Sequence, residues 1–244
     1  MPWHSSLLVG SGMAGLVSYS IYRGVTCPAS RLFGPAVHRG VPGRMEIALT
    51  FDDGPDPRWT PLFSERLWKL NMPATFFCIA ERAKQHPNSV ADLVAAGHQV
   101  GNHSYSHPNL WFRSSSAVRD ELQRAQEVLA RAAGKPPSLF RPPFGDRGPQ
   151  VLHEAKRLGL TTVLWSLSGK DWNNPEQSWI VNRVLRRVRD GEIVLFHDAS
   201  HDQAFPDRRG TLDAVCELVP VLKRRGFKFV TVGTMIAHTR EAMR

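Results

Sequence analysis

Short runs of apolar, β-branched or aromatic residues alternate along the chain with longer segments whose apolar positions recur at helical spacing. A short apolar run bounded by turn residues is typical of a buried strand, and a recurrence every three to four residues is typical of an amphipathic helix. The pattern predicts strands over residues 46–51, 74–79, 99–102, 139–141, 161–165, 193–196 and 227–232. It predicts helices over residues 60–70, 88–96, 116–133, 150–158, 176–190 and 211–225.

Residues at the ends of these segments agree with the predicted helices. Ser116 is expected to begin its helix, with Asp120 and Glu121 in the first turns. Five predicted helices are each followed by a glycine, as is common where helices end: Gly97, Gly134, Gly159, Gly191 and Gly226. Alternating strands and helices predict a mostly parallel α/β sheet, either open or closed into a barrel. Since neither composition nor repeats divide residues 44–240, we expect a single domain over residues 45–240 behind an N-terminal arm over residues 1–44.

The composition is that of an ordinary globular protein. Of 244 residues, 42% are hydrophobic and 22% charged, which argues against a disordered chain or a polytopic membrane protein. The three cysteines, Cys27, Cys78 and Cys216, are far apart, so neither a disulfide framework nor a cysteine-based zinc site is expected.

The net charge is positive, with 31 Lys and Arg against 22 Asp and Glu. The densest basic run lies within residues 183–189, where arginines alternate with apolar residues at helical spacing, as on a helix with a solvated basic face. No basic module with interleaved aromatic residues is visible, so nucleic-acid binding is not expected. The charge supports attraction to an anionic surface only.

The first 22 residues lack charged side chains, and residues 7–22 are mildly apolar. This stretch is long enough for a membrane span or the apolar part of an export signal. Gly10, Gly12 and Gly15 dilute its hydrophobicity, and the positive charges follow it rather than precede it. We favour a membrane or export segment over a loosely packed arm.

Two adjacent carboxylates, Asp52 and Asp53, end the first predicted strand and precede a Gly-Pro turn. Like charges this close disfavour joint ionisation unless a cation or an arginine compensates them. A turn cap would explain one aspartate but hardly both. Active sites of parallel α/β folds gather at the carboxyl ends of strands, which makes this pair a candidate site.

Two histidines four residues apart, His103 and His107, follow the third predicted strand. A helical turn would direct both imidazoles at one ion, although such a pair is weak evidence alone. One aspartate and two histidines supply three ligands and leave coordination positions for water and substrate, which is the pattern of a catalytic metal site.

Three further polar clusters follow later strands. In the Arg141-Pro-Pro-Phe144-Gly145 segment, the prolines stiffen the loop and leave the N–H groups of Phe144 and Gly145 as candidate oxyanion donors, and Arg141 could hold a carboxylate. The same segment could be a simple tight turn. Trp172, after Asp171, is either a core residue or a wall for a sugar face, and His197 ends a buried strand on the same predicted rim.

Five motifs in this order resemble the polysaccharide deacetylases, which are carbohydrate esterase family 4 or the NodB-homology domain. They are TFDDGP (50–55), HSYSH (103–107), RPPFG (141–145), DW (171–172) and IVLFH (193–197). The resemblance covers roughly residues 45–235, and its first two motifs are highly specific. It implies a distorted (β/α) barrel of seven or eight mostly parallel strands.

The resemblance also implies a role for each matching residue. Asp53, His103 and His107 resemble the metal ligands, most often of zinc and in some members of cobalt. Asp52 resembles the catalytic base, Arg141 the arginine that orients it, His197 the general acid and Asp171 the carboxylate that tunes this acid. The N–H of Phe144 resembles the oxyanion donor, although many members have Tyr there, and Trp172 and Leu195 resemble walls of the acetyl pocket.

The implied activity is metal-dependent removal of N-acetyl groups from an amino sugar in chitin oligomers or peptidoglycan. An N-acetylated glycan is therefore the expected partner, in the cell envelope or elsewhere outside the cytoplasm, with possible attachment to a membrane through the N-terminal segment. Two alternatives stay open: an amide hydrolase acting on an acetylated polyamine or a cyclic imide, and a catalytically silent protein that binds the cell wall. The motifs leave the oligomeric state open.

Overall fold

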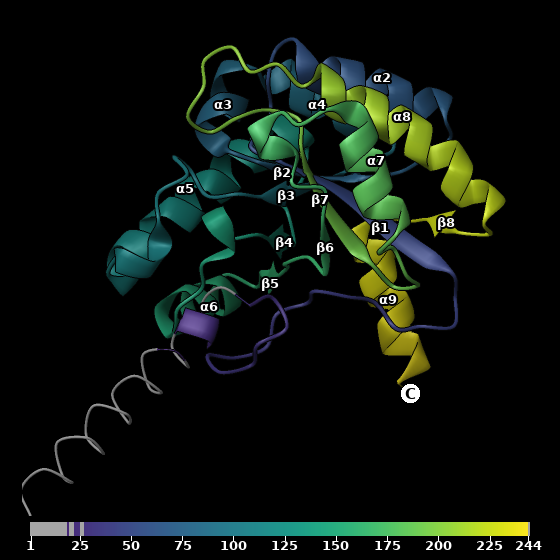
Figure 1. Ribbon diagram of the computed structural model, residues 1–244. Coiled ribbons are helices and arrows are strands. Elements are labelled where there is room, and N and C mark those ends of the chain that lie inside the picture. Colours follow the sequence, from purple (N-terminus) through teal and green to yellow (C-terminus); the bar gives the residue numbers. More distant parts are fainter. Residues whose placement is uncertain (1–18, 20–21, 25–26, 244) are drawn as a thin grey trace, which may run out of the picture.

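A parallel sheet forms the centre of the computed structural model, which describes residues 19, 22–24 and 27–243 (Figure 1). Its strands in the described chain are β1 (Glu46–Asp52), β2 (Thr75–Cys78), β3 (Gln99–Asn102), β4 (Leu139–Phe140), β5 (Thr161–Thr162), β6 (Leu167–Ser168), β7 (Ile193–His197) and β8 (Lys228–Phe229). The order is β5-β4-β3-β2-β1-β7-β6, with β8 beside the start of β1. All seven residues of β1 are buried, so this strand is the middle of the core.

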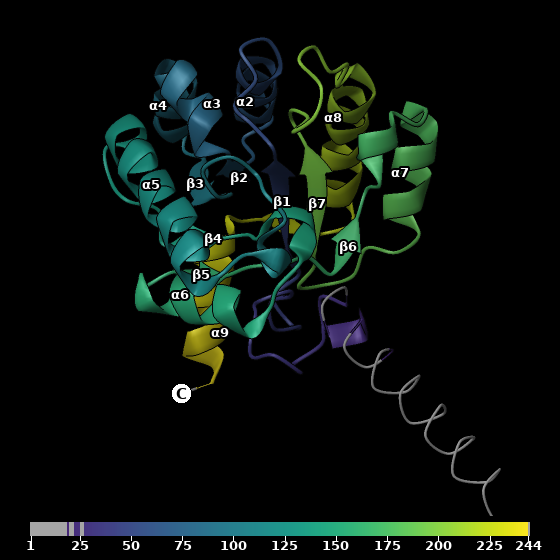
Figure 2. The ribbon, with the colours of Figure 1, turned by 90° about the vertical axis from the view of Figure 1, so that its left-hand side faces the viewer.

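Helices surround the strands, as Figure 2 shows. They are α2 (Trp59–Lys69), α3 (Ala80–Gln85), α4 (Pro87–Ala95), α5 (Ser115–Ala133), α6 (Pro149–Arg157), α7 (Gln177–Leu185), α8 (Arg209–Arg224) and α9 (Val232–Ala242). Aromatic rings join the layers: Phe51 of β1 lies 5.0 Å from Phe63 of α2 and 4.9 Å from Phe76 of β2, between ring centroids. Burying such rings is a main source of stability in a core of this type.

The N-terminal arm spans the gap between the two sides of the sheet. The N–H of Val37 donates to the carbonyl of Thr162 (2.9 Å), and the N–H of Gly40 donates to the carbonyl of Gly191 (2.8 Å). Residues 37–40 therefore connect the β5 side to the β7 side. The arrangement is a distorted, incompletely paired barrel of parallel strands, which confirms the predicted fold class.

Some predicted elements differ from the observed ones. Ser114 caps α5 by accepting the N–H of Ala117, and the helix begins at Ser115, one residue before the predicted start at Ser116. The predicted helix over 176–190 is shorter because α7 ends at Leu185. The strand predicted over 161–165 is only the two-residue β5, and β6, α3 and α9 were not predicted. The five glycines expected at helix ends all have φ between +71° and +86°, which glycine adopts without strain.

The predicted membrane or export segment lies almost wholly outside the described residues. Among the helices that the structure describes, none combines the length and apolar character needed to cross a bilayer. The division into an arm over 1–44 and a domain over 45–240 stays a prediction.

Candidate active site

A cavity of about 370 Å³ lies at the carboxyl ends of the strands. Eight of the residues predicted from the sequence line it: Asp52, Asp53, His103, His107, Phe144, Trp172, Leu195 and His197. The other two, Arg141 and Asp171, lie behind it and bond to Asp52 and His197. Segments separated by more than a hundred residues thus meet in one pocket because parallel strands end on the same side of a sheet.

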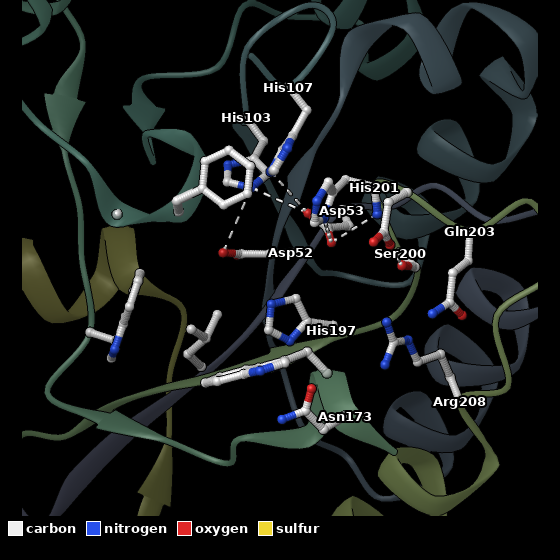
Figure 3. A pocket seen from close by; sticks show the side chains of 16 residues that line it. Asp52, Asp53, His103, His107, Asn173, His197, Ser200, His201, Gln203 and Arg208 are labelled. Carbon is white, nitrogen blue, oxygen red and sulfur yellow. Dashed lines mark hydrogen bonds and ion pairs between the residues drawn. The ribbon is translucent and has the colours of Figure 1, made fainter. Parts of the chain in front are cut away.

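Asp53, His103 and His107 form a group that could hold a metal ion, with one ligand atom from each and all three within 4.8 Å of one another. The Nε2 atoms of His103 and His107 lie 3.5 and 3.3 Å from Oδ1 of Asp53 (Figure 3). The two histidines do not lie on a helical turn, which was the arrangement considered from their spacing. A loop brings them together, with positive φ at Ser104 (66°) and His107 (60°).

Polar contacts from neighbouring elements hold this loop. Glu121 of α5 accepts the backbone N–H groups of Tyr105 and Ser106, both at 3.0 Å. The N–H of Ser104 donates to Oδ1 of Asn102 (2.8 Å). Because these acceptors stand on α5 and β3, the placement of the two imidazoles depends on the packed scaffold.

The protonation states of the group suit a divalent cation. Nδ1 of His103 lies 2.7 Å from the carbonyl oxygen of Arg141, which selects the tautomer with a proton on Nδ1 and a free lone pair on Nε2. Burial lowers the pKa of His107, so its ring is neutral at neutral pH. Burial opposes ionisation of Asp53, but its close contacts with His103, His107 and His201 outweigh it and hold its pKa well below the usual range. A carboxylate and neutral imidazoles are the ligand types that zinc prefers.

Asp52 is held apart from this group by Arg141, which is fully buried. Nη1 of Arg141 donates to Oδ1 of Asp52 at 2.7 Å and to the hydroxyl of Thr50 at 2.8 Å, and Nη2 donates to the carbonyl of Leu164. Oδ2 of Asp52 lies 3.9 Å from Nε2 of His103, next to the proposed metal ligands. The positive charge of buried Arg141 compensates the carboxylate of Asp52, so both aspartates can be ionised side by side.

His197 and Asp171 form a second polar pair. Nδ1 of His197 lies 3.0 Å from Oδ1 of Asp171, and Oδ2 of Asp171 accepts the backbone N–H of His197 at 2.8 Å. Burial opposes protonation of the ring, but the carboxylate of Asp171 outweighs it and raises the pKa of His197 to about 9. The imidazole is therefore protonated at neutral pH, which suits a proton donor.

The remaining predicted residues form walls and a turn of the site. Phe144 has φ = 60° and ψ = 0° and turns the chain beside His107, with 4.7 Å between the two ring centroids. The N–H of Gly145 donates to the carbonyl of Pro142, so only Phe144 keeps its place as a candidate oxyanion donor. Leu195 is buried, and Trp172 is half-exposed with its ring edge-to-face on His197.

Sequence reasoning missed several residues of the site. His201 lies beside Asp53, and Arg208 and Trp165 line the cavity. Asp198, the residue after His197, is fully buried and accepts a hydrogen bond from the hydroxyl of Thr60. His201 follows His197 by four residues, the spacing that also separates His103 and His107, and this was the signal that could have found it. For the others the signal was position: Trp165 ends a predicted strand, and residues 198–208 follow a strand that carries a candidate acid.

Comparison with known proteins adds an independent line of support. The family model described as polysaccharide deacetylase matches residues 39–163. A peptidoglycan-N-acetylglucosamine deacetylase of Bacillus cereus is 36% identical over 81% of this chain and 70% of its own length. A chitooligosaccharide deacetylase of Azorhizobium caulinodans is 37% identical over 74% of this chain and 90% of its own length.

The fold is also shared with a protein described as inactive. The crystal structure of a carbohydrate esterase family 4 pseudoenzyme from Bacillus anthracis superposes with a TM-score of 0.76 at 29% identity, covering 82% of this chain and 68% of that one. Family membership alone therefore does not establish turnover, and the side chains of the site carry that question. From its motifs, its fold and these relatives, the chain belongs to the polysaccharide deacetylase family, a family of metal-dependent hydrolases.

Proposed function

We propose that the protein is a zinc-dependent deacetylase that removes N-acetyl groups from the amino sugars of peptidoglycan or of chitin oligomers. The observation that carries the proposal is the complete set of groups around one cavity: three metal-ligand candidates, a carboxylate paired with a buried arginine, and an imidazole paired with a buried carboxylate. A protein that only binds a glycan has no need of this combination.

The two ionisable pairs divide the proton transfers. Arg141 holds one oxygen of Asp52, so the other is free to take a proton from the attacking water as its oxygen bonds to the acetyl carbon. His197, protonated and oriented by Asp171, donates a proton to the sugar nitrogen as the C–N bond breaks. The products are acetate and a free amine.

The other residues stabilise and position the acetyl group. In this proposal the N–H of Phe144 donates to the oxygen that becomes negative during attack. Leu195 and Trp172 line the same cavity as His197 and would bound the space that takes the methyl group. A divalent ion held by Asp53, His103 and His107 would polarise the carbonyl and make water acidic enough to attack at neutral pH.

Removal of the metal should abolish activity. We expect EDTA to stop acetate release from N-acetylated chitooligosaccharides and from peptidoglycan, and zinc or cobalt to restore it. Acetate assay and metal analysis of the same samples would check this. Undiminished release from metal-free protein would contradict the proposal.

A substrate panel separates the proposal from its alternatives. Acetate release from the glycans, with no turnover of acetylated polyamines or cyclic imides, is the expected result. Turnover of the small amides alone would point to the second activity, and glycan binding without turnover by zinc-loaded protein would identify a silent binding protein.

The activity should fall on the alkaline side as His197 loses its proton. Since the pKa of His197 is raised from 6.5 to about 9, the proton donor is present below that pH and is lost above it. Asp171→Asn removes the charge that raises this pKa, so we expect the alkaline limb of kcat to move down by about 1–3 pH units. A pH profile of both proteins would measure the shift; an unchanged limb would contradict the pairing.

Action on peptidoglycan places the protein outside the cytoplasm, in the cell envelope. Its net positive charge suits an anionic envelope. Attachment through residues 1–22 is part of this proposal, and fractionation of cells with and without that segment would test it.

A further inference from the structure

His201 lies beside Asp53 and next to the proposed ligand His107 (Figure 3). Its backbone N–H donates to Oδ2 of Asp53 at 3.1 Å, and its ring Nδ1 lies 3.4 Å from the same oxygen. His103 and His107 face the other oxygen, Oδ1. The two oxygens of Asp53 thus have different partners.

The ring of His201 also packs against the site. It is stacked on His107, with 4.4 Å between centroids and 25° between planes, and it meets Phe144 edge-on at 5.2 Å. His107 meets Phe144 edge-on as well. The three rings form a contact cluster in which movement of His201 would disturb both a proposed ligand and the loop of the oxyanion donor.

Helix α3 bonds to both loops that carry histidines beside Asp53. Arg82 donates to the carbonyl of Ser200, next to His201. From the same helix, Ala80 donates its N–H to the carbonyl of Ser104 at 3.1 Å, in the loop that carries His107. On the other side of the His201 loop, Nε of Arg208 donates to the carbonyl of Ala199 at 2.7 Å. His201 is therefore held in register with the proposed ligands by the scaffold.

We propose that His201 is a positioning residue of the metal centre. This proposal rests on the proposed metal site. The ring Nδ1 of His201 reinforces the backbone N–H on Oδ2 of Asp53, which keeps the carboxylate from rotating and leaves Oδ1 facing the two imidazoles, and the ring supports His107. Partners of this kind behind a metal ligand typically contribute about 10–100-fold to metal affinity. A role as a further ligand is disfavoured, because Nδ1 of His201 approaches Oδ2 and, in the described chain, only Asp53, His103 and His107 group within 4.8 Å.

Three variants separate the hydrogen bond from the ring. His201→Asn keeps a side-chain donor near the position of Nδ1, His201→Phe keeps an aromatic ring without the Nδ1 donor, and His201→Ala removes both. The backbone N–H of residue 201, which also donates to Asp53, is present in all three variants. Zinc affinity would be measured by competition with a chromogenic chelator, and the melting temperature of each metal-free protein would show that it folds. We expect zinc affinity about 10–100-fold weaker in the Phe and Ala variants and within about threefold of wild type in the Asn variant.

Wild-type zinc affinity in folded His201→Phe would overturn the proposal. Equal losses in the Asn and Phe variants would overturn the hydrogen-bond argument, and a changed ligand-field spectrum of the cobalt-loaded Ala variant would show that His201 is a ligand instead. Asp53→Asn is the control for the site itself. If this variant binds zinc like wild type, the proposed metal site is wrong, which is distinguishable from a failure of the His201 proposal alone.

Discussion

Asp52→Asn is expected to lower kcat/KM for acetate release by about 10²–10⁴-fold while zinc stays bound. Asparagine has nearly the same shape and keeps an oxygen for Nη1 of Arg141, but it cannot take a proton from the attacking water. The proposed zinc ligands do not include Asp52, whose Oδ1 is held by Arg141 at 2.7 Å. Steady-state kinetics and zinc analysis of the purified variant would measure both quantities.

Asp53→Asn is the matched comparison, since the two aspartates are neighbours in the chain but have different partners. We expect this variant to lose zinc and activity together. Circular dichroism should show that both variants fold, although Asp52→Asn leaves the buried guanidinium of Arg141 without a full counter-charge and should melt at a lower temperature. An Asp52→Asn variant with more than about a tenth of wild-type activity would contradict the assignment of the base.

Much of the fold could be predicted because its main elements carry local signals. Strand β1 is an uninterrupted buried run, and α5 and α8 have clear apolar faces. Strand β6 has only two residues and no apolar run of its own. It exists because Leu167 pairs with Val194 of β7, a contact that only the folded chain provides. Helix α3 has six residues, too few for a helical period to be visible.

The candidate site shows the same division between local and tertiary information. Asp52 and Asp53, or His103 and His107, stand together in the chain, so spacing alone made them candidates. His197 and His201 have the same four-residue spacing, but they do not share a partner: His197 pairs with Asp171, whereas His201 lies beside Asp53 in a loop held by hydrogen bonds from Arg82 and Arg208. A helical turn would have brought the two histidines together; in the structure, positive φ angles in a loop achieve the same convergence.

Because a pseudoenzyme of Bacillus anthracis shares this fold, the fold alone does not show that this chain is active. A barrel of this type can persist without turnover, since the core that stabilises it lies apart from the groups that do chemistry. In this chain the buried pairs Asp52–Arg141 and Asp171–His197 are both formed. Burying a charge pair gains little stability over a well-packed apolar pair, so function is the better reason to keep two of them beside one cavity.

His197→Asn should distinguish a proton donor from a structural histidine by its dependence on the leaving group. An amine leaves as a neutral molecule only after it is protonated, whereas p-nitrophenolate leaves without a proton. We therefore expect kcat for an N-acetylated chitooligosaccharide to fall by about 10²–10⁴-fold, and the zinc-dependent hydrolysis of p-nitrophenyl acetate to fall by less than about tenfold.

Asp52→Asn supplies the control for this comparison, because the attacking water must lose a proton whichever group departs. Its loss should be large for both substrates. A His197→Asn variant with equal losses on the amide and the ester would show that His197 supports the site without donating a proton. A loss confined to the amide would tie the raised pKa of His197 to the step in which the C–N bond breaks.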